Sequence, residues 1–253
     1  MKKLIKSKRN TLVWVIKTSK ALYLDDSYLK KFEATVKSVK DDKFVVLDKT
    51  AFYPSSGGQP FDEGSMIKDG EEFKVVFVGK FGGEISHEID HPGLKTGDKV
   101  TSKIDWSRRY KLMQAHTSSH VVSTLIHEET DALISGNQLG TEKNRIDFSL
   151  DDYDASKMAN YIKRSDEILK KGLDVTVKYM PRNEAMKIPS IIKLANALPP
   201  SIEILRIVSI GDFDTQADGG THVKNTSEIG TLEFLKAENK GKNNRRVYYK
   251  INY

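Results

Sequence analysis

The chain has 253 residues, enough for one large domain or two ordinary ones, and a formal net charge of +6. It contains no cysteine, which excludes disulfides, a thiol nucleophile, iron–sulfur clusters and thiolate ligands for zinc. The moderate excess of lysine and arginine favours a phosphate-bearing partner. Because the chain has no cysteine, a tightly bound transition metal would need imidazole and carboxylate ligands, and six histidines are available.

The N-terminus is basic and carries one short apolar run, Leu12–Ile16. A secretory leader needs roughly 7–15 consecutive apolar residues, and a membrane span needs about 20. We therefore expect a cytoplasmic protein without membrane association. Residues 1–19 are predicted to be an N-terminal extension.

Short β-branched runs alternate with turn residues over Phe32–Ile104. Examples of these runs are Ala34–Val39, Phe44–Leu47, Phe73–Val78 and Lys99–Ile104. Strands of this length and spacing are typical of a small antiparallel β-barrel. His87 and His91 lie near a predicted turn and are expected at the surface.

The pattern changes to helical spacing after this region. Arg108–Leu133 contains no glycine or proline and predicts a long helix, and Ala155–Lys171 predicts a second one. Further strands are predicted at Val175–Tyr179, Ile204–Ile210, Leu232–Lys236 and Arg245–Asn252. The expected fold class is α+β, with a β-barrel domain over residues 20–105 and an α+β domain over residues 106–253.

Two pairs of candidate metal ligands stand far apart in the sequence. His116 and His120 are four residues apart in the long predicted helix, so their rings share one face. Asp218 and His222 are also four residues apart, in the segment Asp-Gly-Gly-Thr-His. Two ligands at each of two places is a common way to build a zinc site. His127 lies seven residues beyond His120, about 10.5 Å along the helix axis, and is not expected to join them.

Each pair also has a plainer interpretation. A single His-x-x-x-His pair is a weak signal, and Thr117 stands where zinc proteases carry their glutamate base, which argues against a protease. The segment around Asp218 also suits a polar turn in which the carboxylate bonds its own backbone.

Four segments of the sequence carry recognisable motifs: Leu47–Pro60, Trp106–His120, Gly136–Gly140 with Arg145–Phe148, and Ile207–Thr226. Together they resemble the editing domain of alanyl-tRNA synthetases and the freestanding alanyl-tRNA editing proteins of the AlaX type. Trp106–His120 resembles the first signature of that domain, and Ile207–Thr226 resembles the second, which normally contains Cys-Gly-Gly-Thr-His. Gly136–Gly140 with Arg145–Phe148 is similar to a strand of the family, and Leu47–Pro60 resembles the glycine-rich motif of the medium-length members.

The four motifs stand in the family order, over about residues 20–235, and no aminoacylation or anticodon module accompanies them. The resemblance implies a freestanding protein with an editing domain of the threonyl/alanyl-tRNA synthetase type. It also implies that the glycine-rich motif packs near the editing site.

The resemblance assigns zinc (Zn²⁺) to His116, His120, Asp218 and His222. Asp218 stands where the family usually has cysteine, so we expect weaker zinc binding and more tolerance of other divalent ions. The alternative is a degenerate site without metal.

The implied reaction is hydrolysis of the ester that joins a wrong amino acid, serine or glycine, to the 3′-terminal ribose of tRNA specific for alanine. Gln138 is the expected polar residue of the pocket, and Asn137, Thr117 and Thr221 are lesser candidates. For each of them the alternative is ordinary loop hydrogen bonding.

The implied partner is the acceptor end of that tRNA. We expect the protein to be a monomer and not to bind DNA. A basic, aromatic C-terminal stretch is a candidate for phosphate contacts or a solvated hairpin: Lys236, Lys240, Lys242, Arg245, Arg246, Tyr248 and Tyr249. The competing function is a non-catalytic tRNA-binding module derived from an editing domain.

Overall fold

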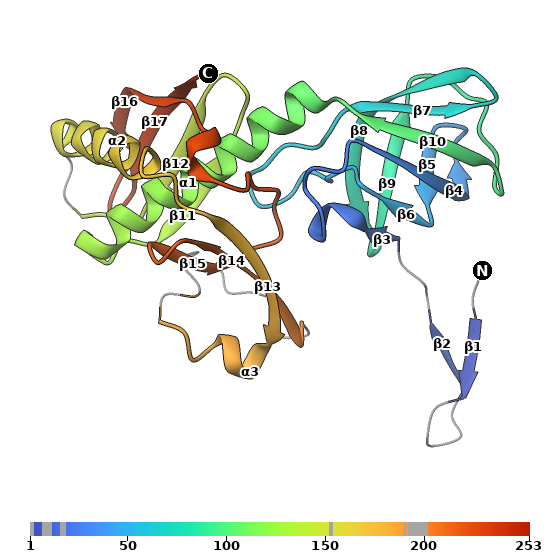
Figure 1. Ribbon diagram of the computed structural model, residues 1–253, viewed down its shortest axis with the longest axis horizontal. Coiled ribbons are helices and arrows are strands. Elements are labelled where there is room, and N and C mark those ends of the chain that lie inside the picture. Colours follow the sequence, from blue (N-terminus) through green and yellow to red (C-terminus); the bar gives the residue numbers. More distant parts are fainter. Residues whose placement is uncertain (1–2, 7–11, 16–18, 152–153, 190, 192–201) are drawn as a thin grey trace. The chain divides into compact units, whose positions relative to one another are not determined.

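The computed structural model describes residues 3–6, 12–15, 19–151, 154–189, 191 and 202–253 (Figure 1). The chain divides into two compact units. The first consists of Met1–Ser56 and Phe61–Arg109, and the second of Gly57–Pro60 and Tyr110–Tyr253. The α+β fold class with an N-terminal barrel is confirmed, whereas the limits 20–105 and 106–253 for the two domains stay a prediction.

The first unit contains a closed barrel of antiparallel strands in the order β10–β4–β5–β9–β8–β7 (Figure 1). The strands are β4 (Lys31–Lys40), β5 (Phe44–Leu47), β7 (Gly64–Lys68), β8 (Glu71–Phe81), β9 (Glu84–Ile89) and β10 (Lys99–Ile104). Alternate residues point inward, as Phe32, Ala34 and Val36 do on β4, and together they form an apolar core. The alternation in the sequence therefore produced the predicted barrel.

Smaller elements complete this unit. β1 (Lys3–Lys6) and β2 (Leu12–Val15), within the predicted extension, pair antiparallel. β3 (Lys20–Ala21) pairs parallel with β6 (Lys49–Thr50), and the 3-10 helix η1 covers Leu22–Leu24.

His87 is buried, so its expected place at the surface was wrong. Its side chain is 0% exposed inside the barrel, on β9. One ring nitrogen lies 2.9 Å from the Thr50 hydroxyl and the other 2.9 Å from the Val45 carbonyl, so both find partners. Burial lowers the pKa of His87 to about 4, which keeps the imidazole neutral. His91 is 40% exposed, as a surface residue should be.

The first unit contains a buried ion pair between Arg109 and Asp62. Arg109 and Asp62 are both fully buried, and Arg109 Nε donates to the two carboxylate oxygens over 2.9 and 3.0 Å. Arg109 also donates to the Ser27 carbonyl over 2.9 Å, and Asp62 accepts from the Tyr53 amide over 2.6 Å. These partners satisfy charges that would be costly if they were buried alone.

The second unit contains two sheets and two long helices (Figure 1). The helices are α1 (Trp106–Thr130) and α2 (Ala155–Leu169). One antiparallel sheet has the order β11–β12–β17–β16, from Ile134–Gln138, Asn144–Phe148, Arg245–Asn252 and Thr231–Asn239. The other has the order β13–β14–β15, from Val175–Pro181, Ile204–Ile210 and Asp214–Ala217. Short helices α3 (Arg182–Ala185) and η2 (Thr226–Glu228) lie in the connections.

The ends of the two helices have local causes. α1 ends at Thr130, earlier than predicted, because Asp131 adopts a left-handed backbone with φ of +56°. α2 begins after Asp154, whose carboxylate accepts from the amides of Ser156 and Lys157. Within the described residues, no helix is long and apolar enough to cross a membrane.

Strand β17 contributes to both the core and the surface. Val247 and Tyr249 are fully buried, and the Tyr249 hydroxyl lies 3.0 Å from Ser118 Oγ on α1. Arg245 is also buried, and its guanidinium donates to backbone carbonyls such as that of Gly241. The basic C-terminal stretch therefore does not present Tyr249 and Arg245 to RNA.

Candidate metal centre

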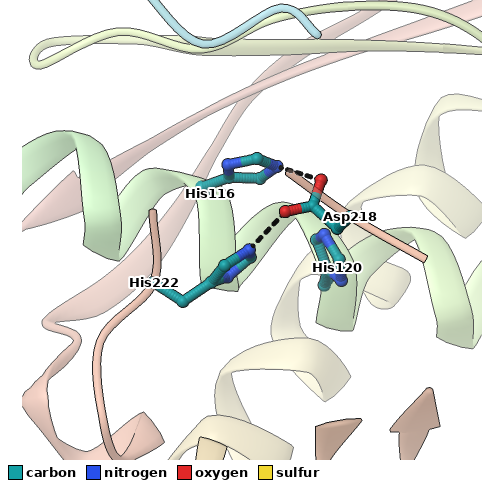
Figure 2. A group of neighbouring side chains, drawn as sticks. All are labelled: His116, His120, Asp218 and His222. Carbon is teal, nitrogen blue, oxygen red and sulfur yellow. Dashed lines mark hydrogen bonds and ion pairs between the residues drawn. The ribbon is translucent and has the colours of Figure 1, made fainter. Parts of the chain in front are cut away.

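Four side chains from two distant segments converge in the second unit. His116 and His120 come from α1, and Asp218 and His222 from the loop after β15 (Figure 2). One ligand atom from each lies within 4.8 Å of the other three. Each carboxylate oxygen of Asp218 contacts a different ring: Oδ2 lies 2.9 Å from His222 Nε2, and Oδ1 lies 3.5 Å from His116 Nε2. The structure thus brings together the four residues that the sequence proposed.

The loop after β15 aims Asp218 at the histidines. The Asp218 amide donates to the Arg206 carbonyl over 3.0 Å, which extends the β14–β15 ladder by one residue. Asp218 Oδ2 also accepts from the Gly220 amide over 2.6 Å. The polar turn proposed as the plainer interpretation therefore exists, and the same turn presents the carboxylate to the rings.

A side chain at position 220 would collide with His116. A Cβ atom on Gly220 would lie 2.0 Å from Cε1 of His116. By contrast, a Cβ on Gly219 would meet nothing within 4 Å. Of the two glycines in Asp-Gly-Gly-Thr-His, the second is thus required by the close approach of a ligand.

The Nδ1 atom of each histidine has a protein partner, so the three Nε2 atoms are directed towards one another. His116 Nδ1 lies 2.8 Å from Gln59 Oε1, and His120 Nδ1 lies 3.0 Å from Asp214 Oδ2. His222 Nδ1 lies 3.1 Å from Thr117 Oγ1. Such outer partners fix the ring orientation and tautomer of metal-binding histidines.

Gln59 joins the glycine-rich motif to the centre. Its side chain is buried, its amide nitrogen donates to Thr221 Oγ1 over 2.8 Å, and its Oε1 accepts from the Thr221 amide over 3.2 Å. Because the same oxygen also faces His116, Gln59 ties two parts of the site together. The last part of the motif, Gly57–Pro60, therefore packs at the site, although sequence reasoning did not single out Gln59.

Asp214 is another residue that sequence reasoning missed. It is buried on β15 and accepts from Thr124 Oγ1 over 2.9 Å and from the Gln216 amide over 3.0 and 3.1 Å. These donors keep its carboxylate in place against His120. Asp214 occupies an inward position of β15, and a buried carboxylate needs hydrogen-bond partners. An aspartate at such a position was the signal that could have identified it as part of the site.

Burial sets the ionisation of the cluster. It lowers the pKa of His116 well below its ordinary range and that of His222 to about 4. Burial would raise the pKa of Asp218, but the neighbouring His116 and the hydrogen bond from His222 hold it well below its ordinary value. At neutral pH His116 and His222 are therefore neutral imidazoles and Asp218 is a carboxylate, the forms that bind a metal ion.

This donor set fits zinc. Three imidazole nitrogens and one carboxylate oxygen are ordinary zinc ligands at about 2.0–2.2 Å, and one such atom from each residue lies within 4.8 Å of the others. Arg206 lies beside the same carboxylate, with one guanidinium nitrogen 3.7 Å from Asp218 Oδ2 and 2.9 Å from its carbonyl oxygen. His127 stays outside the cluster, as expected, with Nδ1 3.0 Å from the Ala132 carbonyl.

The predicted pocket residues occupy different positions. Thr117 and Thr221 are buried against the centre and hydrogen-bonded as described. Gln138 is exposed at the end of β11. Asn137 packs on Gly58 so closely that a Cβ there would lie 1.7 Å from its Oδ1, and the Leu139 amide donates to the Gly58 carbonyl over 2.9 Å. Their roles in recognition stay predictions.

Two protein families match parts of the chain. The family described as "tRNA synthetases class II (A)" matches residues 5–108. The family described as "Threonyl and Alanyl tRNA synthetase second additional domain" matches residues 205–248, which include Asp218 and His222.

Curated relatives match along nearly the whole chain. The alanyl-tRNA editing protein AlaX-M of Methanosarcina barkeri is 48% identical over 92% of this chain and 99% of its own length. The AlaX-M protein of Saccharolobus solfataricus is 46% identical over 91% of this chain and 98% of its own. The alanine–tRNA ligase of Pyrococcus abyssi is 36% identical over 90% of this chain but only 25% of its own length. The chain therefore belongs to the family of alanyl-tRNA editing proteins of the AlaX-M type.

Proposed function

We propose that this protein deacylates mischarged tRNA specific for alanine, as a hydrolase that acts in trans on the ester at the 3′ end. The observation that carries the proposal is the full-length similarity to AlaX-M editing proteins, joined to a cluster with three histidines and one aspartate. Seryl-tRNA is the first substrate to test and glycyl-tRNA the second. The proposed setting is the cytoplasm, with a monomeric protein.

Hydrolysis of this ester does not require a strong nucleophile. An ester is already activated, so a catalyst needs mainly to position it and to polarise the attacking water or the carbonyl. A zinc ion held by His116, His120, Asp218 and His222 would supply Lewis-acid polarisation or a fixed anchor for the 3′ end. Gln59 and Asp214 would hold the imidazoles in orientation, because each bonds the outer nitrogen of one ring.

Selection of serine over alanine follows from hydrogen bonding. A site built to bond a hydroxyl rejects the analogue without it by about 10⁴–10⁵, because its own polar groups would be left unpaired. Gln138 is proposed to make that contact, and Thr117 and Thr221 to shape the polar wall. The rejection of alanine would then protect correctly charged tRNA.

The test compares three charged forms of one tRNA. Zinc-loaded protein is expected to deacylate seryl-tRNA specific for alanine, and to leave the alanyl form intact. His116→Ala should abolish the activity. If the loaded protein leaves both the seryl and the glycyl forms intact, the proposed function is wrong.

Metal analysis tests the site without reference to activity. The purified protein is expected to hold one zinc ion, and Asp218→Ala should lose it. Absence of zinc from the wild-type protein after zinc addition would contradict the assignment.

A second candidate is a non-catalytic tRNA-binding module. Asp218 favours it, because this residue replaces the cysteine that is usual at the position and is a weaker zinc ligand. This candidate predicts salt-sensitive tRNA binding without deacylation. Measurable turnover of seryl-tRNA would eliminate it.

A further inference from the structure

An exposed aromatic ring lies on an edge strand of the three-stranded sheet, whose strand β15 leads into the loop of Asp218 and His222. β13 is an outer strand of the three-stranded sheet, and Tyr179 on it is 50% exposed. Val177 on the same strand is 41% exposed, and Ile204 on β14 is 54% exposed. These three side chains form an apolar surface at this edge of the sheet, and we name them the edge patch.

The strand register connects the edge patch to the metal centre. Tyr179 and Arg206 are direct partners across β13 and β14, so their side chains lie on one face of the sheet. Asp218 continues the same row, since its amide bonds the Arg206 carbonyl. The row Tyr179, Arg206, Asp218 therefore runs from an exposed ring, across one buried guanidinium, to a metal ligand.

The neighbouring rows place the rest of the edge patch on the same face. Val177 pairs with Val208, and Ile204 pairs with Pro181, each two residues from the central row. On the opposite face, Leu205 and Ile207 pack in a small apolar core with Ala185 and Ile191. Core packing therefore accounts for one face of the sheet, and the face with Tyr179 is directed towards the site.

We propose that the edge patch is the stacking platform for the 3′-terminal base of the acceptor strand. The inference rests on the proposed function, because the ester to be cleaved is on the ribose of that last nucleotide. With the ester at the metal centre, the attached base must lie within one nucleoside of it, and the Tyr179–Arg206–Asp218 row covers two inter-strand spacings, about 10 Å. Unpaired RNA ends commonly stack on aromatic side chains.

The size of the edge patch favours this occupant over a protein. A stable protein interface buries about 800 Å² on each partner, roughly 20–30 residues, whereas the patch is one ring with two aliphatic neighbours. A single base needs only such a surface. Addition of a partner strand to β13 is the competing use, and the experiment separates the two.

The first experiment measures base dependence of binding. Uncharged tRNA specific for alanine is prepared with its normal terminal adenine and with an abasic terminal nucleotide. Removal of the base should weaken binding to the wild-type protein by about 5- to 150-fold, the range for one stacked base. The loss should persist in Tyr179→Phe and fall below about twofold in Tyr179→Ala.

A matched control comes from another exposed aromatic residue. Phe81 on β8 is 61% exposed in the first unit, and Phe81→Ala should retain the full base dependence. Equal base dependence in Tyr179→Ala and the wild type would overturn the proposal. So would a wild-type protein that ignores the base, which is the result expected if β13 accepts a protein strand instead.

The second experiment separates the platform from the reaction. In deacylation of seryl-tRNA, Tyr179→Ala should raise KM while kcat changes little, since stacking positions the substrate without touching the ester. If the wild type deacylates and Tyr179→Ala is unaffected in KM and in binding, the platform is wrong and the function stands. If nothing is deacylated but base dependence requires Tyr179, the function is wrong and the platform stands.

Discussion

Asp214 lies outside the candidate ligand set but contacts one of its histidines. It accepts from Nδ1 of His120, and Thr124 and Gln216 hold it there by donating to the same carboxylate. A neutral amide at this position would bind the ring less strongly and leave its orientation less fixed.

Asp214→Asn is therefore expected to lower zinc affinity by about 10- to 100-fold, the usual effect of an outer partner. The measurement is a competition titration against a zinc chelator. Asp212→Asn is the matched control, since Asp212 is exposed two residues away, and it should bind zinc like the wild type. Equal affinity in the two variants would remove Asp214 from the site.

His87 gives the fold a dependence on pH. Its pKa is about 4 in the folded chain and near its ordinary 6.5 when unfolded. Between these values the unfolded chain binds a proton that the folded chain does not, so the free energy of unfolding falls as the pH falls from about 6.5 to 4. The loss is about 1.4 kcal/mol per pH unit, about 3 kcal/mol in total, and it stops below both values.

Urea unfolding at several pH values tests this. His87→Gln should be less stable at pH 7, because Thr50 and Val45 lose a well-placed partner. Its unfolding free energy should then depend less on pH between 6.5 and 4 than that of the wild type. Parallel curves for the two proteins would mean that His87 titrates normally in the folded chain.

At the scale of elements, ligand positions depend on how a strand continues into a loop. β15 ends at Ala217, and one further ladder bond places Asp218 before the chain turns through two glycines. The turn then returns His222 to the same carboxylate. A short segment can thus supply two ligands only if the chain passes close to His116.

The two adjacent glycines provide a test of that close approach. Gly220→Ala should displace His116 and lose stoichiometric zinc, because its Cβ would lie 2.0 Å from Cε1 of that ring. Gly219→Ala adds the same methyl group one residue earlier, where nothing lies within 4 Å, and should keep its zinc. Measuring the zinc content of both variants tests whether a side chain at position 220 displaces His116. Retention of metal by Gly220→Ala would show that the loop packs differently.

For the whole molecule, the relevant property is the net charge of +6. A basic protein that contacts RNA phosphates releases counterions, so the logarithm of its binding constant should fall linearly with the logarithm of the salt concentration. We expect this for uncharged tRNA specific for alanine between about 50 and 200 mM salt. Tyr179→Ala should give a parallel line at lower affinity, since stacking releases no phosphate counterions. An affinity independent of salt would argue against phosphate contacts.

Local patterns predicted much of the architecture. The period-two alternation predicted the barrel, and Phe44–Leu47, Lys99–Ile104, Ile204–Ile210 and Arg245–Asn252 match observed strands at both ends. The same alternation could have placed His87 correctly, because Ile85 and Ile89, two residues away on either side, both point inward. The prediction that His87 lies at the surface was nevertheless wrong. Histidine was judged by its polarity, whereas two hydrogen-bond partners inside the barrel make its burial favourable.

The sequence by itself determined the two pairs of candidate ligands, since a spacing of four residues within a helix or a tight loop is a local property. Only the tertiary structure decided the partners of those ligands. Gln59 meets His116 across 57 positions and Asp214 meets His120 across 94, and no local period encodes such distances. The row from Tyr179 to Asp218 likewise depends on strand register. Register follows from which faces are buried in the folded molecule, so the surroundings of the metal centre emerge only once the chain has packed.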